Sequence, residues 1–220
     1  MSVWAVIVAA GRGERLGLDR PKAFAKLNGR PLLAESLERL DGSGWVEAIV
    51  VAAPPDWEEP VILLAEELGC GKVVAVVPGG ENRAASVRAG LAEVADDAAV
   101  TLVHDAARPV LPEDVIERLM TGLGEGWDGV VPGLPVADTV KRVDGDRVVE
   151  TVDRASLVGA QTPQAFVWPA LREAVAGGDD ATDCAALVEA RGGRIKVVPG
   201  DRRLLKITEP ADLELAATWL

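Results

Sequence analysis

Histidine, cysteine and basic residues are all scarce in this sequence, and each shortage excludes a class of function. A single histidine cannot build a multi-histidine metal site. The two cysteines, Cys70 and Cys184, are far apart and outside any C-x-x-C spacing, so they indicate reduced thiols in a cytoplasmic protein and no zinc site. With 23 Lys and Arg against 35 Asp and Glu, the net charge of −12 is a poor match for the phosphate backbone of a nucleic acid.

A membrane-spanning or secretory segment is also missing from the pattern. Residues 3–10 are apolar, but they are too few to cross a bilayer and no basic flank precedes them. A buried strand explains them better than a signal peptide does. We therefore expect a protein that binds neither nucleic acid nor membrane.

Apolar, β-branched runs alternate with helical patterns along the 220 residues, of which 49% are hydrophobic. Strands are predicted at 3–8, 48–52, 73–77, 100–103, 129–131 and 194–198, and helices at 31–40, 57–68, 81–94, 112–121, 164–176, 182–190 and 209–220. The strands read as continuous apolar runs, which is typical of parallel strands covered on both faces. The order predicts an α/β fold with a Rossmann-like, doubly wound and mostly parallel sheet.

The alternation breaks after Pro132. Residues 137–143 and 147–152 read as strands and flank Asp144-Gly145-Asp146, and Asp-Gly between two such runs is a strong hairpin signal. A hairpin inserted into an α/β domain often protrudes and meets another subunit. One compact domain, residues 1–220, with a β-arm at about 134–154 is the simplest organisation.

A glycine-rich loop, residues 9–22 (AAGRGERLGLDRPK), directly follows the first predicted strand. Glycines let the backbone approach an anion, and consecutive N–H groups then form a cradle for phosphate. A Walker loop would close with Gly-Lys-Ser/Thr, and a dinucleotide fingerprint would need its third glycine one residue before Gly17 and an acid after the second strand. A triphosphate loop with its own cations, Arg15 and Lys22, fits better. The alternative is a tight turn with solvated cations.

Residues 78–87 (PGGENRAASV) follow the third predicted strand. Two glycines before a helix allow a ligand near the helix N-terminus, whose free N–H groups attract anions or polar base edges. Ser86 lies one helical turn after Arg83, on the same face. A capped helix with a surface arginine is an equally good explanation of this segment alone.

Residues 103–109 (VHDAARP) follow the fourth predicted strand. Open α/β sheets bind ligands at the carboxyl ends of their strands, so Asp105 is well placed to hold Mg²⁺. The alternative is an Asp105–Arg108 ion pair that only ties down the loop. His104, the one histidine, is expected to be a structural residue.

Five later segments have ordinary structural explanations when each is taken alone. They are the two ends of the hairpin at 138–139 and 153–154, the segment 161–164 (QTPQ), the segment 181–183 (ATD) before a helix, and the segment 206–210 (KITEP) before the last helix.

Together the segments form an ordered series from residue 9 to residue 213: AAGxGxRxG…PK, GGxxRxxSV, HDAARP, DTVKR, AQTPQ, TD and KITxPxDL. This series resembles the 2-C-methyl-D-erythritol 4-phosphate cytidylyltransferases of the non-mevalonate isoprenoid pathway over nearly the whole chain. The first loop alone would indicate only the wider nucleotidyltransferase superfamily, whereas HDAARP with that loop is more specific. The resemblance implies a fold of the nucleotide-diphospho-sugar transferase type and a homodimer joined through the arm.

The resemblance also implies a role for each matching residue. CTP phosphates would be held by Ala9, Ala10, Gly11, Arg15, Lys22 and Lys206, with Arg15, Lys22 and Lys206 as the catalytic cations. Cytosine and ribose would be surrounded by Gly80, Arg83, Ser86 and Ala106, and Asp105 would lie beside Mg²⁺. The methylerythritol phosphate would be gripped by Arg108, Thr139, Arg154, Thr162 and Thr182, with Thr139 and Arg154 serving the neighbouring subunit's active site.

Three rival functions remain open at the level of sequence. Ribitol 5-phosphate cytidylyltransferase differs only in its acceptor pocket. A catalytically silent nucleotide-binding module could dispense with Lys22, Asp105 or Lys206, yet all three are present. A dinucleotide-dependent oxidoreductase is weaker because of the glycine spacing.

Overall fold

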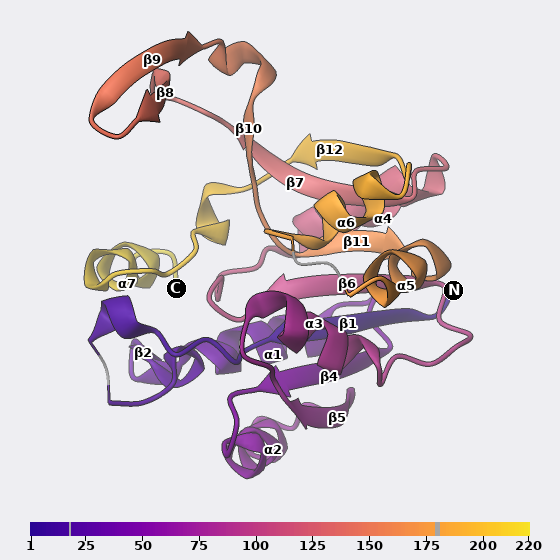
Figure 1. The fold of residues 1–220 in the computed structure, drawn as a ribbon. Coiled ribbons are helices and arrows are strands. Elements are labelled where there is room, and N and C mark those ends of the chain that lie inside the picture. The colour runs from indigo at the N-terminus through magenta and orange to yellow at the C-terminus, as the bar shows by residue number, and fades with distance from the viewer. Residues whose placement is uncertain (18, 179–180) are drawn as a thin grey trace.

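The computed structural model describes residues 1–17, 19–178 and 181–220, and within them the central feature is an eight-stranded sheet (Figure 1). Its strands run in the order β10-β7-β11-β6-β1-β4-β5, with β12 also paired to β7. The strands are β1 (Val3–Val8), β4 (Ala48–Ala53), β5 (Val73–Pro78), β6 (Val100–Asp105), β7 (Gly129–Pro135), β10 (Val158–Ala160), β11 (Gln164–Val167) and β12 (Ile195–Pro199).

The sheet is mostly parallel, as the continuous apolar runs predicted. β1 pairs in parallel with β4 and β6, β4 with β5, and β7 with β12. β11 is antiparallel to both β6 and β7, and β10 is antiparallel to β7. The fold is therefore the expected α/β, Rossmann-like type, extended beyond β6 by β7, which precedes the hairpin, and by β10, β11 and β12, which follow it.

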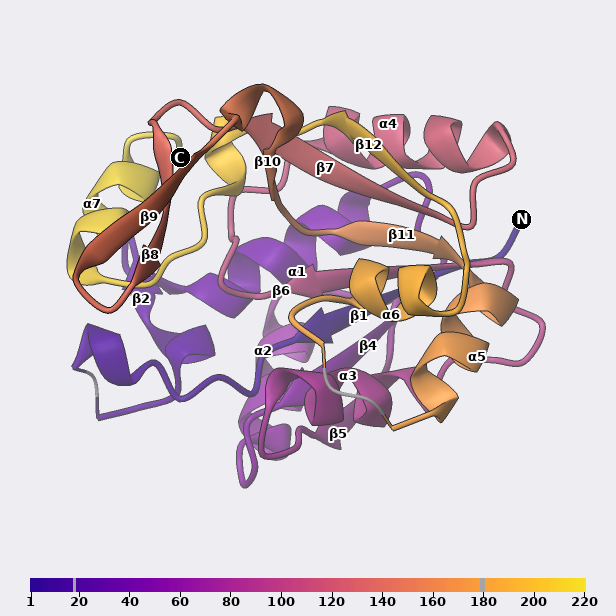
Figure 2. The same ribbon diagram turned by 45° about the horizontal axis from the view of Figure 1, so that its top comes forward.

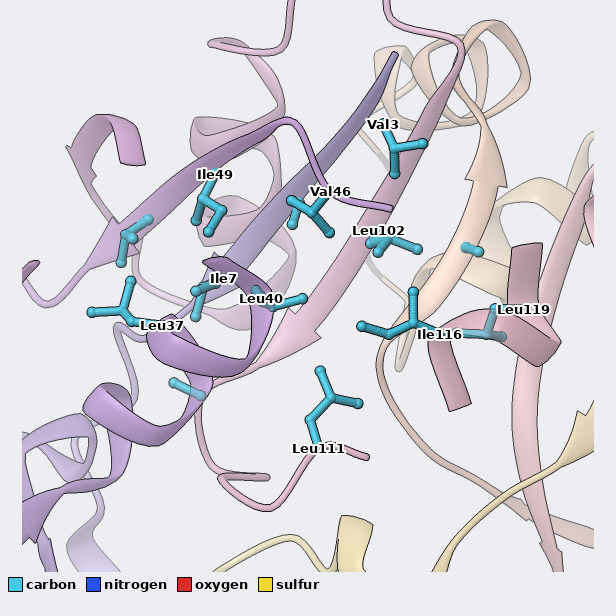
Figure 3. Packing of buried hydrophobic residues seen from close by; sticks show 14 of the residues in the cluster. Val3, Ile7, Leu37, Leu40, Val46, Ile49, Leu102, Leu111, Ile116 and Leu119 are labelled. Atoms are coloured by element: carbon cyan, nitrogen blue, oxygen red, sulfur yellow. The ribbon is translucent and has the colours of Figure 1, made fainter. Parts of the chain in front are cut away.

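Helices cover both faces of the sheet, because successive side chains of each strand point to opposite faces. One core contains side chains of α1 (Leu32–Gly42), α2 (Glu58–Glu67) and α4 (Glu113–Gly124), and it includes Ile7 (Figure 3). The other contains side chains of α3 (Arg83–Leu91), α5 (Trp168–Ala176) and α6 (Cys184–Ala190), and it includes Val6. Neighbouring residues of β1 thus enter opposite cores.

A third, smaller core lies where the N-terminal and C-terminal parts of the chain meet. It joins Leu16, Leu32 and Ile207 with Ala216 of α7 (Pro210–Ala217) and includes Leu27 of the short strand β2 (Lys26–Leu27), which pairs with β3 (Arg30–Pro31). Figure 2 shows α7 and β2 on the side of the molecule toward which β1 runs. This cluster fixes Leu16, in the glycine-rich loop, against Ile207, the neighbour of Lys206.

The predicted hairpin is present as β8 (Val140–Asp144) and β9 (Arg147–Val152). Gly145 supplies the positive φ of 55° that the tight turn requires. The arm stands away from the sheet in Figure 1, and Val143, Val148 and Val149 are each at least half exposed.

The single helix predicted over residues 164–176 is wrong in its first part. Gln164 to Val167 form β11, and α5 begins only at Trp168. This strand fills the space between β6 and β7, and its backbone groups pair with both neighbours. Tertiary pairing thus overrides a local pattern that is ambiguous for so short a run. β10 was not predicted, and Pro31 and Pro112 precede their helices as N-cap residues instead of occupying the first turn.

We expect Leu119→Ala to lower the free energy of unfolding by about 2–5 kcal/mol, because it leaves a cavity in a close-packed core. Leu119 is fully buried in α4, whereas Leu63 in α2 is 56% exposed. The matched change Leu63→Ala should stay within about 0.5 kcal/mol of the wild type. Urea unfolding of both variants measures the difference, and equal losses would contradict the assignment of this core.

Candidate active site

Most of the predicted site residues gather at the carboxyl ends of the parallel strands, where open α/β sheets bind ligands. The glycine-rich loop follows β1, residues 79–82 follow β5, and residues 106–109 follow β6. Ala106 is anchored there by its N–H, which donates to the Val8 carbonyl at 3.1 Å. Loops from strands far apart in the sequence therefore share one edge of the sheet.

The glycine-rich loop folds back on itself, so that its start and end are in contact. The Lys22 N–H donates to the Gly11 carbonyl at 3.1 Å. Gly13 has a φ of 72°, and a Cβ at that position would lie 2.8 Å from the Lys22 Cβ. Only glycine fits this approach, which leaves Arg15 exposed to solvent and Lys22 half-buried beneath the turn.

The segment after β5 packs directly on the glycine-rich loop. A Cβ on Gly79 would lie 2.3 Å from the Ala10 Cβ, so this glycine permits the contact. Asn82 caps α3 by accepting from the Ala85 N–H at 2.8 Å. The buried Ser86 hydroxyl accepts from the Gly80 N–H at 3.1 Å and donates to the Asn82 carbonyl at 2.9 Å. Ser86 therefore shapes the glycine turn.

Asp105, the last residue of β6, is the electrostatic centre of this edge. Its carboxylate accepts from Arg83 Nε at 2.9 Å and from Lys206 Nζ at 2.8 Å. Burial by itself would raise the pKa of Asp105, but the charges and hydrogen bonds of Arg83 and Lys206 outweigh it and hold the pKa well below its usual value. The carboxylate is therefore ionised at any physiological pH.

Arg108 does not form the alternative ion pair with Asp105. It donates to the Leu204 carbonyl at 2.5 Å, and so ties the segment that carries Lys206 to the end of β6. The Ile207 N–H, which donates to the Ala107 carbonyl at 2.8 Å, adds a second tie.

His104 is a buried structural residue, as its isolation in the sequence predicted. Its Nε2 lies 3.2 Å from the Arg108 carbonyl, and its Nδ1 lies 3.5 Å from Thr162 Oγ1. Burial lowers the pKa of His104 to about 4, so the imidazole is neutral near pH 7.

Lys22 faces the other cations of the site. Burial lowers its pKa to about 8, and the charges of Lys206 and Arg15 act in the same direction. An acidic protein thus contains a local cluster of cations held close enough to repel one another. Such a cluster favours a multiply charged anion as ligand.

The remaining predicted residues lie in three places. The Thr162 hydroxyl is buried and accepts from the Asp105 N–H at 3.0 Å. Thr182 is exposed immediately before Asp183, the residue that caps α6. Thr139 and Arg154 are exposed at the base of the arm, where Arg154 donates to the Ala137 carbonyl. The single chain therefore brings together the phosphate-loop and Asp105 groups, while the arm holds its two residues apart on the hairpin.

Two buried glutamines, Gln161 and Gln164, were not among the predicted site residues. The sequence does carry a signal for them, because both belong to the AQTPQ segment that also contains Thr162. Within residues 1–17, 19–178 and 181–220, no group of three or more His, Cys, Asp or Glu side chains could hold a metal ion. None of the helices in those ranges is both long and apolar enough to cross a membrane.

The glycine-rich loop, residues 9–22, lies beside the cations Arg15, Lys22 and Lys206 at the carboxyl edge of a Rossmann-like sheet. This arrangement defines a nucleotidyltransferase. The family model for 2-C-methyl-D-erythritol 4-phosphate cytidylyltransferase matches residues 3–220, and the chain belongs to that family.

Relatives with this name support the assignment over the full length. The chain is 49% identical to the cytidylyltransferase of Saccharopolyspora erythraea, with 100% of both chains covered. It is 48% identical to that of Nocardia farcinica, covering 100% of this chain and 94% of the relative. The crystal structure of the Thermus thermophilus enzyme aligns with a TM-score of 0.79 at 33% identity, covering 97% and 96% of the two chains.

We expect the affinity of the protein for a nucleoside triphosphate to fall above pH 8. The Lys22 ammonium is present below its lowered pKa of about 8 and is lost above it, so binding weakens by up to about tenfold per pH unit beyond that point. Calorimetric titrations between about pH 6.5 and 9.5 measure this, because unperturbed lysines titrate only near 10.4.

Lys22→Arg should remove the alkaline loss of affinity, since a guanidinium keeps its charge over this range. Lys196, which pairs with Glu125 away from the loop, provides the matched control Lys196→Arg. An alkaline loss that persists unchanged in Lys22→Arg would contradict the role of Lys22.

Proposed function

We propose that this protein transfers CMP from CTP to 2-C-methyl-D-erythritol 4-phosphate, giving CDP-methylerythritol and pyrophosphate. The observation that carries the proposal is the cation cluster of Lys22, Lys206 and Arg83 around the buried carboxylate of Asp105. The named relatives carry the same activity in their names and share the whole chain. The positive charge of the cation cluster and its position at the carboxyl edge of the sheet both fit a bound triphosphate.

The reaction needs charge stabilisation more than proton transfer. An oxygen of the acceptor phosphate attacks the α-phosphorus of CTP in line, a new P–O bond forms, and the bond to the bridging oxygen of the β-phosphate breaks. The nucleophile is already an anion, so no general base is required, which agrees with a neutral, buried His104. Catalysis is then positioning of two anions and stabilisation of charge on pyrophosphate.

The chain's residues divide into three groups in this proposal. The phosphates of CTP lie against the backbone of Ala9, Ala10 and Gly11 and the cations Arg15, Lys22 and Lys206. Cytosine and ribose lie against Gly80, Arg83, Ser86 and Ala106. The acceptor phosphate and its polyol lie against Arg108, Thr162 and Thr182, with Thr139 and Arg154 supplied by a second copy.

Magnesium fits the donor set at Asp105. Mg²⁺ is commonly bound through one or two carboxylates plus substrate phosphates and water, so a single carboxylate beside a triphosphate suffices. When bound, the ion would neutralise charge on the triphosphate. Asp105 would hold the ion, and Arg83 and Lys206, which contact the same carboxylate, would lie beside the bound phosphates.

We propose a homodimer in which each arm reaches the other subunit's site. Three half-exposed valines, Val143, Val148 and Val149, line an arm that stands clear of its own sheet. Exposed apolar side chains grouped in this way favour burial at an interface. Two free, buried cysteines are compatible with a reducing compartment, and we propose the cytoplasm as the location.

The ribitol and silent-module alternatives gain no support from the named relatives. The direct test is pyrophosphate release from CTP with methylerythritol phosphate or ribitol phosphate as acceptor, and with ATP, GTP and UTP as controls. Turnover should require CTP and methylerythritol phosphate. Preference for ribitol phosphate, or no release with any pair, would overturn the proposal.

In the same assay, Lys22→Ala and Lys206→Ala should each lower kcat by about two orders of magnitude or more, as for loss of a preorganised contact to the transition state. Lys196→Ala is the matched control, because Lys196 lies in β12 and pairs with Glu125. Near-normal turnover in either site variant would contradict the assigned roles.

Mixing two inactive variants tests the exchange of arms. If Arg154 serves the neighbouring site, subunits carrying Arg154→Ala and Lys206→Ala form mixed dimers in which one site lacks both groups and the other is intact. Random reassociation should restore about a quarter of wild-type sites, as expected for a twofold-symmetric dimer. Mixtures that stay inactive after subunit exchange would exclude the shared site.

A further inference from the structure

The segment from Gln161 to Gln164 contains three buried polar side chains, and the proposed function uses only one of them. Gln161, Thr162 and Gln164 are 6%, 4% and 1% exposed. Buried polar groups require partners, so where these side chains bond is informative. Each bonds to a different part of the chain: Gln161 to Asp201, Thr162 to Asp105 at the end of β6, and Gln164 to Asp183 at the start of α6.

Gln161 holds the loop that leads to Lys206. Its side-chain Nε2 donates to the Asp201 carbonyl at 2.9 Å, and its Oε1 accepts from the Asp201 N–H at 3.0 Å. The amide thus satisfies both backbone groups of one residue, five positions before Lys206. The fit is close, because a Cβ on Gly200 would lie 2.3 Å from Gln161 Oε1.

Gln164 holds the start of α6, next to Thr182. Its side-chain Nε2 donates to Asp183 Oδ2 at 2.8 Å, and its Oε1 accepts from the Ala185 N–H at 3.4 Å. Asp183 Oδ1 accepts from the Ala186 N–H at 3.0 Å as the helix cap. One glutamine therefore fixes the orientation of the carboxylate that ends the Thr182 loop.

The backbone of this segment is itself well fixed. Gln164 begins β11 and is paired with Val103 of β6, two residues before Asp105. The Gln161 N–H donates to the Pro132 carbonyl at 2.8 Å, and Thr162 accepts from the Asp105 N–H. Site residues keep a precise geometry only when the groups that support them are themselves fixed by packing and hydrogen bonds. This segment meets that condition.

We propose that Gln161 and Gln164 are positioning residues that act on separate halves of the reaction. Gln161 sets Lys206 against the triphosphate, and Gln164 sets Thr182 against the acceptor phosphate. This inference rests on the proposed function. It adds that Gln161 affects the binding of CTP and Gln164 affects the binding of the acceptor, although the two residues are three positions apart in the chain.

The test replaces each glutamine with methionine, which keeps a similar volume and removes both hydrogen bonds. Gln161→Met should raise KM for CTP by about tenfold or more while KM for the acceptor stays within about twofold, and Gln164→Met should do the reverse, as supporting partners typically contribute 10–100-fold. Both KM values are measured by pyrophosphate release, and CTP binding is measured by equilibrium dialysis.

Three further variants make the outcome decisive. Ser43→Ala removes another buried polar contact, from Ser43 to Glu113 at 2.9 Å between α1 and α4, and should lower the melting temperature without changing either KM. Lys206→Ala and Thr182→Ala are references: Lys206→Ala should raise KM for CTP in addition to lowering kcat, and Thr182→Ala should raise KM for the acceptor. Suppose that both references change the KM values as expected. The inference is then overturned if each glutamine variant changes both KM values equally, or if it changes only the melting temperature. If the references themselves fail, the role assignment falls, and the inference with it.

Discussion

Asp105 carries a buried negative charge, and three parts of the chain must come together to compensate it. Arg83 and Lys206, which are 22 and 101 residues away, each place a cation within 3 Å of its carboxylate. An uncompensated buried charge costs about 3–5 kcal/mol, so neither partner can leave without replacement. This constraint holds the loops after β5 and β6 and the C-terminal segment in one arrangement, and that arrangement defines the ligand-binding edge.

The same constraint explains how an acidic chain retains a site for anions. The chain has a net charge of −12, yet Arg15, Lys22 and Lys206 are brought close enough for burial and mutual repulsion to lower the pKa of Lys22 to about 8. Repulsion among fixed cations is relieved when a polyanion binds between them. The fold therefore favours a triphosphate as ligand, because it holds these three cations close together.

Much of this could be predicted from the sequence, for identifiable reasons. The core strands were predictable because parallel strands buried on both faces read as continuous apolar runs, and the hairpin because Asp-Gly between two such runs specifies a tight turn. β11 was not predictable: residues 164–167 become a strand only because β6 and β7 leave a gap for it. The supporting roles of Gln161 and Gln164 were not predictable, because only the fold places their partners, the Asp201 backbone and the Asp183 carboxylate, opposite their amides.

The sequence by itself determined which chemical groups are available and in what order, together with the periodicities that make an α/β sheet. It left open whether Asp105 pairs with Arg108, and whether residues 78–87 form a ligand-binding turn or only a capped helix with a surface arginine. The tertiary structure decided the first, since Asp105 pairs with Arg83 and Lys206, and it showed that Arg83 contacts a buried carboxylate instead of lying free on the surface. The physical reason is that hydrogen bonds and ion pairs act over about 3 Å, and only the parallel sheet brings residues so distant in the chain to that range.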